Sequence, residues 1–146
     1  LAKATGHKLV MAGKVDEVDR DFYAKEIEPH IDNRQITYIG EVNHEQKVDL
    51  LRNAKATVCA VTWPEPFGLV LAESLACGTP VLALRNGSIP EVVEHGLTGF
   101  VADTPEELQG YVSRIGEIDR AACRRQTERR FSVERMTEDY VETYRR

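Results

Sequence analysis

The sequence predicts an α/β fold: a Rossmann-like parallel sheet with helices on both faces, in one domain that spans residues 1–146. Short apolar runs alternate along the chain with segments that carry helix-capping signals, and this alternation is typical of βα units. Right-handed crossovers would place such strands side by side in parallel. The length of 146 residues and the hydrophobic share of 42% suit one globular domain with its own core.

Five apolar runs are predicted as strands. Each is short and rich in aliphatic or β-branched residues, as buried parallel strands are. In chain order they span residues 7–13, 35–40, 56–62, 81–84 and 99–102. Ligands bind at the carboxyl ends of the strands in such sheets. We therefore expect the segments that follow the first four strands to meet along one edge, namely residues 13, 40–42, 62–68 and 85–88.

The first two helices are predicted from spacing and capping. Residues 18–30 carry apolar side chains near helical spacing, although Pro29 disfavours a regular last turn. Asn43 and Gln46 have the spacing of a capping box, which predicts a helix that starts there.

The later helices also begin at recognisable signals. One runs from the turn at Gly68 to Cys77, before a glycine that ends it. Ser88 and Glu91 form a capping-box pattern for a short helix, and Thr104 precedes a proline suited to the first helical position. Two last helices are expected over residues 119–130 and 132–146.

The start of the chain carries a separate signal. Leu1 is not a start methionine, and the residues up to Gly6 are typical of the tail of a helix that ends at a glycine. We therefore expect the chain to be an excised piece of a larger protein.

The composition argues against several classes of protein. A net charge of −5 argues against a general nucleic-acid binder, because neutralising phosphates requires a basic surface. Asp119 and Glu128 interrupt the arginine cluster of residues 120–130, so we interpret it as a solvated helix face. No apolar run reaches the roughly 20 residues that span a bilayer. The three cysteines have no metal-ligand spacing and indicate reduced thiols in a cytoplasmic protein.

The stretch from Glu65 to Glu73 carries the most chemical information. Two carboxylates, separated by seven residues, bracket a Pro-Phe-Gly turn that opens an apolar helix. The turn presents unpaired backbone N–H groups at a helix start, which favours an anionic ligand such as a phosphate. The carboxylates lie roughly two helical turns apart, so they can accept hydrogen bonds from sugar hydroxyls on either side of that phosphate. The pattern indicates a nucleotide-sugar site.

This arrangement resembles the retaining glycosyltransferases of family 4, which have the two-domain GT-B fold. The resemblance rests on the Glu-x7-Glu motif of Glu65 and Glu73, on residues 87–93 (GSIPEVV) and on residues 95–101 (HGLTGFV). It covers nearly the whole chain and implies the C-terminal, donor-binding domain. The full-length enzyme would transfer a hexose from a nucleotide diphosphate sugar, a UDP- or GDP-hexose, to a glycan, lipid or small-molecule acceptor.

The resemblance also implies roles for individual residues. Glu65 would be the catalytic residue and would contact the hexose hydroxyls, whereas Glu73 would hold the ribose diol. The turn between them would contact the sugar and the pyrophosphate through Pro66, Phe67, Gly68 and Leu69. Val42 and Lys47 would lie beside the nucleobase. No metal or other cofactor is implied, and the expected partners are the donor sugar and an N-terminal acceptor domain of the same protein.

Simpler interpretations stay open for several residues. Glu65 could act only on the helix dipole, an effect worth about 0.3–1 kcal/mol. Lys47 suits a plain surface position, and Gly87 with Ser88 suits a turn and a helix cap. The Trp63 side chain either lines the sugar site or packs in the core. The four histidines have no nucleophile or metal partner in the sequence, so we expect them at the surface.

The sequence also departs from the family that it resembles. That family carries an Arg and a Lys that neutralise the donor pyrophosphate, in a segment that would lie before Leu1. Without these cations and the acceptor domain, we expect this chain alone to be inactive and to bind nucleotide weakly. Two rival functions remain: a GT-B nucleotide-sugar 2-epimerase, and a nucleotide-binding module without catalysis.

Overall fold

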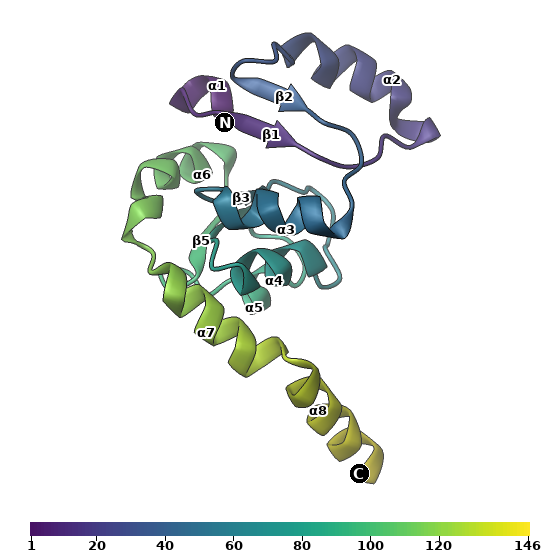
Figure 1. Cartoon of the computed structure of the whole chain (residues 1–146), viewed down its shortest axis with the longest axis vertical. Helices are drawn as coiled ribbons and strands as arrows, with labels where there is room; N and C mark the ends of the chain where they lie inside the picture. Colours follow the sequence, from purple (N-terminus) through teal and green to yellow (C-terminus); the bar gives the residue numbers. More distant parts are fainter. The chain divides into compact units, whose positions relative to one another are not determined.

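The computed structural model describes residues 1–146, and the chain divides into two compact units, Leu1–Lys47 and Val48–Arg146. Strands and helices alternate along both units, and every strand pair is parallel (Figure 1). The predicted α/β class is therefore confirmed. Hydrogen bonds join the five strands as two sheets, one with the order β1-β2 and one with the order β3-β4-β5.

The first unit contains the smaller sheet. Strands β1 (Leu9–Met11) and β2 (Ile36–Tyr38) pair in parallel, and helix α1 (Ala2–Thr5) precedes them. The backbone of Gly6 is left-handed, with φ of 70°, so α1 ends where the sequence predicts. The segment between the strands is helical but irregular: η1 (Glu17–Asp19), α2 (Arg20–Phe22), the π-helical η2 (Tyr23–Ile27) and η3 (Glu28–His30).

Hydrogen bonds between side chains and backbone hold this unit together. The Asp32 carboxylate accepts from the backbone N–H groups of Ile36, Arg34 and Gln35, and these bonds lower its pKa to about 2. The Tyr38 hydroxyl donates to the Gly13 carbonyl over 2.7 Å. The unit buries little apolar surface, since Ala2 and Ile36 are its only buried hydrophobic residues.

Helix α3 (His44–Asn53) begins with the capping box that the sequence predicts. The backbone N–H group of Asn43 donates to Oε1 of Gln46 over 3.0 Å, and the backbone N–H group of Gln46 donates to Oδ1 of Asn43 over 2.9 Å. Each residue therefore satisfies an N–H group of the other.

The second unit holds the three-stranded sheet, with β4 (Val81–Leu84) between β3 (Thr57–Cys59) and β5 (Gly99–Ala102). Strands β4 and β5 occupy the predicted residues, whereas β3 is shorter than predicted. The remaining elements are α4 (Leu69–Ala76), α5 (Ile89–Val92), α6 (Pro105–Tyr111), η4 (Val112–Glu117), α7 (Arg120–Phe131) and α8 (Val133–Arg145).

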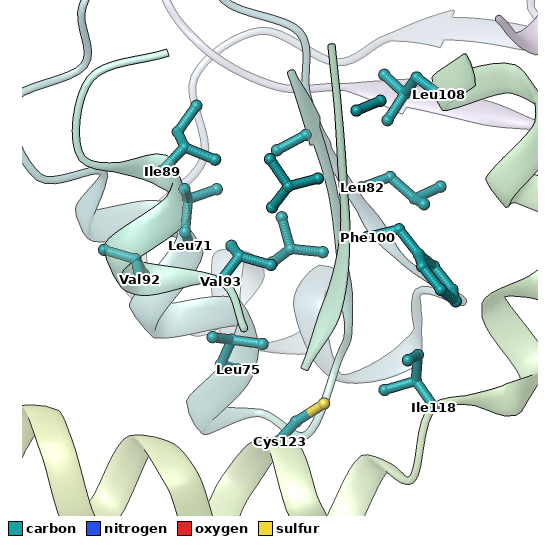
Figure 2. Close-up of a cluster of buried hydrophobic side chains, with 14 of the residues drawn as sticks. Leu71, Leu75, Leu82, Ile89, Val92, Val93, Phe100, Leu108, Ile118 and Cys123 are labelled. Carbon is teal, nitrogen blue, oxygen red and sulfur yellow. The ribbon is translucent and has the colours of Figure 1, made fainter. Parts of the chain in front are cut away.

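Side chains pack against both faces of this sheet. Figure 2 shows Leu71 and Leu75 of α4, with Val92 of α5, on one side of the strands. Leu108 of α6 and Phe100 lie on the other side. All five are buried. The β3-β4-β5 sheet is therefore the middle layer of a continuous apolar core.

Three arginines of α7 bind the ends of other helices. The Arg120 guanidinium donates to the carbonyls of Arg52 and Ala54, at the end of α3, over 2.7 and 2.8 Å. Arg124 donates to the Ala76 carbonyl at the end of α4 over 2.8 Å, and Arg130 donates to a carbonyl of α5. The interpretation as a merely solvated face is therefore wrong for these three, because they satisfy carbonyls that a helix end leaves unpaired.

Helix α8 differs from the other helices of its unit because all its residues are exposed. It continues beyond the end of α7 in Figure 1. The helix exposes several large apolar side chains, namely Val133, Met136, Tyr140, Val141 and Tyr144. None of the helices has the length and apolar character that a membrane span requires.

Candidate functional site

The predicted turn at Gly68 is present between β3 and α4. Gly68 is the N-cap residue of α4 and has φ of 78° and ψ of 62°, in the left-handed region. A Cβ atom at this position would lie 2.9 Å from Cδ1 of Leu71, a buried core residue. The left-handed backbone therefore favours glycine here, and a larger residue would also press on the Leu71 side chain.

The Glu65 carboxylate folds onto this turn. Its Oε1 atom accepts a hydrogen bond from the Gly68 amide over 3.1 Å, and the residue is half-buried. The bond places a negative charge beside the N-terminus of α4, where the helix dipole stabilises it. It also orients the carboxylate, and it leaves the second oxygen, Oε2, for other donors.

The amides at the start of α4 complete the polar part of the turn. Leu71 donates its N–H group to the Gly68 carbonyl over 2.9 Å. The amides of Leu69 and Val70 lie in the first turn and have no partner within the helix. Carboxylate and amides together can bind a ligand that has hydroxyl groups next to a phosphate.

Several residues next to Glu65 in the sequence have exposed apolar side chains. Trp63 is 58% exposed, so the alternative that it fills the core is wrong. Phe67 is partly exposed and its ring contacts the Phe131 ring edge-on, with centroids 5.6 Å apart. Pro66 and Leu69 are exposed as well. The predicted substrate-binding turn therefore lies at the surface of its unit.

Glu73 lies in the second half of α4 and is half-buried. The sequence suggests a helix that is apolar nearly all round, but the burial is one-sided. Leu71 and Leu75 are buried, whereas Leu69 and Val70 are 71% and 43% exposed. A carboxylate at residue 73 therefore does not lie in an apolar interior.

The segment that follows β4 meets the segment that carries Glu65. The Ser88 amide donates to the Glu65 carbonyl over 2.8 Å, and Nδ2 of Asn86 donates to the Val61 carbonyl over 2.7 Å. Two of the four segments that were expected to converge thus lie together in the second unit. The Asn86-Gly87 pair at the end of a strand is a turn signal, and a turn is the role that the sequence favours for Gly87.

Ser88 does not act as the predicted side-chain cap. It precedes α5, but its backbone angles, φ of −77° and ψ of −6°, are those of a helix instead of the extended conformation of a capping residue. Its Oγ atom is buried and has no hydrogen-bond partner. The capping-box prediction for Ser88 and Glu91 is therefore wrong.

The residues expected beside the nucleobase lie in the first unit. Val42 is half-buried in the segment between β2 and α3, and the Lys47 amide donates to the Asn43 carbonyl over 2.9 Å within α3. In the same unit, the Gly13 amide donates to the Gly40 carbonyl, so the segments after β1 and β2 also meet. The four histidines are exposed, as expected.

Sequence comparison relates the chain to glycosyltransferases. Residues 2–130 match the family model described as glycosyl transferases group 1. The chain is 31% identical over 137 residues to glycogen synthase of Mycobacterium tuberculosis, which covers 92% of this chain and 32% of that protein. It is 38% identical over 84 residues to D-inositol 3-phosphate glycosyltransferase of Mycolicibacterium smegmatis, covering 58% of this chain and 19% of that protein. The chain thus spans about a third or less of the length of these relatives.

Solved structures share the fold. AviGT4, a glycosyltransferase involved in avilamycin A biosynthesis, matches with a TM-score of 0.75 and 29% identity over 99% of this chain and 45% of that one. Anabaena HepE in complex with UDP-glucose matches with a TM-score of 0.77 and 23% identity, over 94% of this chain and 40% of that one. These likenesses agree with the parallel α/β architecture of GT-B glycosyltransferases. Because the family model covers most of its length, the chain belongs to the family of glycosyl transferases group 1.

Proposed function

We propose that this chain is the donor-binding domain of a retaining glycosyltransferase of family 4. The full-length enzyme transfers a hexose from a nucleotide diphosphate sugar, a UDP- or GDP-hexose, to a glycan, lipid or small-molecule acceptor. An N-terminal domain of the same protein holds the acceptor. The relatives' greater length supports a second domain, and the complex of HepE with UDP-glucose supports this class of donor.

One observation carries the proposal: the Glu65 carboxylate is held at the left-handed Gly68 turn, beside the unpaired first amides of α4. Glu65 accepts hydrogen bonds from the hexose hydroxyls. The backbone of the turn, from Pro66 to Leu69, contacts the sugar and the pyrophosphate. These groups bind the part of the donor where the reaction takes place.

The remaining contacts bind the nucleoside. Glu73 accepts hydrogen bonds from the ribose diol, and its half-buried position on α4 keeps it within reach of solvent and ligand. Val42 contacts the base through its backbone, and Lys47 through packing or charge. This arrangement assigns one set of residues to each chemical part of the donor.

The reaction proceeds on one face of the sugar. The acceptor hydroxyl forms the new bond to the anomeric carbon on the side from which the nucleoside diphosphate leaves. The breaking bond leaves its electron pair on the phosphate oxygen, which takes the acceptor proton. Residues of the site position the donor and stabilise charge, and no side-chain nucleophile takes part.

Two rival functions predict different behaviour. A nucleotide-binding module without catalysis would bind the nucleoside diphosphate and the corresponding nucleotide sugar with equal affinity. A nucleotide-sugar 2-epimerase would require a pair of reactive groups at C2 of the sugar, and the Glu65 turn supplies one carboxylate only.

The test is a binding screen of the full-length protein with UDP-, GDP- and ADP-glucose and the matching diphosphates. We expect Glu65→Ala to abolish the preference for the sugar over the diphosphate, with a loss on the order of tenfold or more. We expect Glu73→Ala to weaken binding of both ligands. Isothermal titration calorimetry measures both effects.

Glu106→Ala is the matched control, because Glu106 is an exposed acid in the first turn of α6 and should leave binding unchanged. Unchanged binding in both site variants would overturn the assignment of the site. Robust hexose transfer by residues 1–146 alone would contradict the need for a second domain.

A further inference from the structure

Gly87 lies directly against the backbone of Glu65. A Cβ atom at residue 87 would overlap the backbone nitrogen and oxygen of Glu65 and would lie 2.8 Å from the carbonyl carbon of Pro64. These contacts are to backbone atoms, which cannot rotate away as a flexible side chain can. Gly87 also has φ of 53°, a left-handed conformation that other residues rarely adopt. Residue 87 therefore sets how closely the segment after β4 approaches Glu65.

Hydrogen bonds from the residues on both sides of Gly87 hold the segment after β4 against the segment that carries Glu65. The Ser88 amide donates to the Glu65 carbonyl over 2.8 Å. On the other side, Nδ2 of Asn86 donates to the Val61 carbonyl over 2.7 Å, near the start of the segment that carries Glu65. The segment 86–88 thus holds the segment 61–65 at its two ends.

We infer that residues 86–88 position the Glu65 carboxylate for the donor sugar, an inference that rests on the proposed function. The carboxylate reaches the Gly68 amide over 3.1 Å only if the Glu65 backbone keeps its place. Gly87 and Asn86 are positioning residues in this respect: they touch the backbone that carries Glu65 and act through it.

The size of the effect follows from the precision that such a contact needs. A hydrogen bond weakens steeply once its donor–acceptor distance exceeds roughly 3.5 Å, so a displacement of about 1 Å removes the contact between Glu65 and a sugar hydroxyl. A Cβ at residue 87 would force a displacement of this order, because its clashes are with main-chain atoms. The sugar contact should therefore be lost while the nucleotide contacts, which do not depend on Glu65, are kept.

The test is a double-mutant cycle in the full-length protein. The ligands are the best-binding of UDP-, GDP- and ADP-glucose and its matching diphosphate, measured by calorimetry. We expect Gly87→Ala to reduce the preference for the sugar on the order of tenfold or more, as Glu65→Ala does. In the Glu65→Ala background, Gly87→Ala should have no further effect on that preference, because it acts through Glu65.

Two glycines serve as matched controls. Gly96 has φ of 81° and no atom within 4 Å of a built Cβ, so Gly96→Ala introduces backbone strain without a clash. Gly110 has open space and no positive φ, so Gly110→Ala introduces neither. Both variants should keep the preference for the sugar.

Asn86→Ala is a second test variant, because it removes one hydrogen bond without a clash. It should reduce the preference for the sugar less than Gly87→Ala does, and it replaces Gly87→Ala in the test if that variant does not fold.

Each other outcome contradicts the inference in a distinguishable way. If Glu65→Ala leaves the preference unchanged, the proposed function fails, and the inference with it. If Glu65→Ala abolishes the preference but Gly87→Ala and Asn86→Ala do not lower it, only the positioning role fails. An equal loss in Gly96→Ala, or an effect of Gly87→Ala that persists in the Glu65→Ala background, also overturns the positioning role alone.

Discussion

The two compact units are stabilised by different interactions. In the second unit, Leu71, Leu75 and Phe100 are buried to within 1% and pack against both faces of the β3-β4-β5 sheet. In the first unit, Ile36 and Ala2 are the buried apolar residues, and the Asp32 carboxylate binds three backbone amides. The difference shows that the Glu65–Glu73 segment is built on the part of the chain with the larger core. A stiff support of this kind suits a site that must hold its groups in fixed positions.

The largest expected effect comes from removing a core aromatic ring. Phe100→Ala should lower the free energy of unfolding of the second unit by about 3–5 kcal/mol, because Phe100 is 1% exposed and stacks on Tyr111 with centroids 4.8 Å apart. Phe22→Ala in the first unit, where the side chain is 61% exposed, should cost less than about 1 kcal/mol. Urea denaturation followed by circular dichroism compares the two. Equal losses would contradict the contrast between the units.

A smaller effect on stability distinguishes Thr104 from Ser88, two residues that the sequence predicts as helix N-caps. Thr104 caps α6 by accepting from the Glu107 amide over 3.2 Å, so Thr104→Ala should cost about 1 kcal/mol. Ser88 has a buried hydroxyl without a partner, so Ser88→Ala should leave stability unchanged or raise it slightly. Thermal unfolding of both variants measures the difference. A larger loss in Ser88→Ala than in Thr104→Ala would contradict the structure around Ser88.

The smallest effect is local and depends on pH. The pKa of Asp32 is lowered from 3.8 to about 2 by its backbone hydrogen bonds, that of Ile36 first. The ionised carboxylate therefore stabilises the first unit fully above pH 3.8, and this contribution is lost as the pH falls towards about 2. The rate of hydrogen exchange at the Ile36 amide should therefore rise as the pH falls through this range. In Asp32→Asn, which has no carboxylate to protonate, this rise should be absent.

Asp21→Asn is the control for this measurement, because Asp21 is exposed and accepts none of these amide bonds. It should leave the pH dependence of exchange as in the unchanged protein. The same pH dependence in Asp32→Asn would show that another group protects the β2 amides.

The sequence predicts best where local signals and burial agree. Strands β4 and β5 have the predicted bounds, because both are buried along nearly their whole length and are flanked by turn residues. The capping box at Asn43 and the left-handed Gly68 turn are also local, so the spacing of residues predicts them. The position of Glu65 at the start of α4 follows from the same turn.

The remaining features depend on contacts between distant segments. Ser88 fails as a cap because its amide is bound to the Glu65 carbonyl and its backbone is helical, and a pattern of four residues contains neither fact. The π-helical and 3-10 turns before Ile31 replace a regular helix in a segment with no buried residue. The roles of Arg120 and Arg124 were missed because their acceptors lie 66 and 48 residues away.

The three arginine contacts of α7 have a consequence for where the second unit can be cut. Truncation just before Arg120 would remove the donors to the ends of α3, α4 and α5 at once. Truncation after Phe131 would remove only α8, which is exposed throughout, and would keep every one of these anchors. We therefore expect the second unit to fold without α8, with Phe131 as its last required residue.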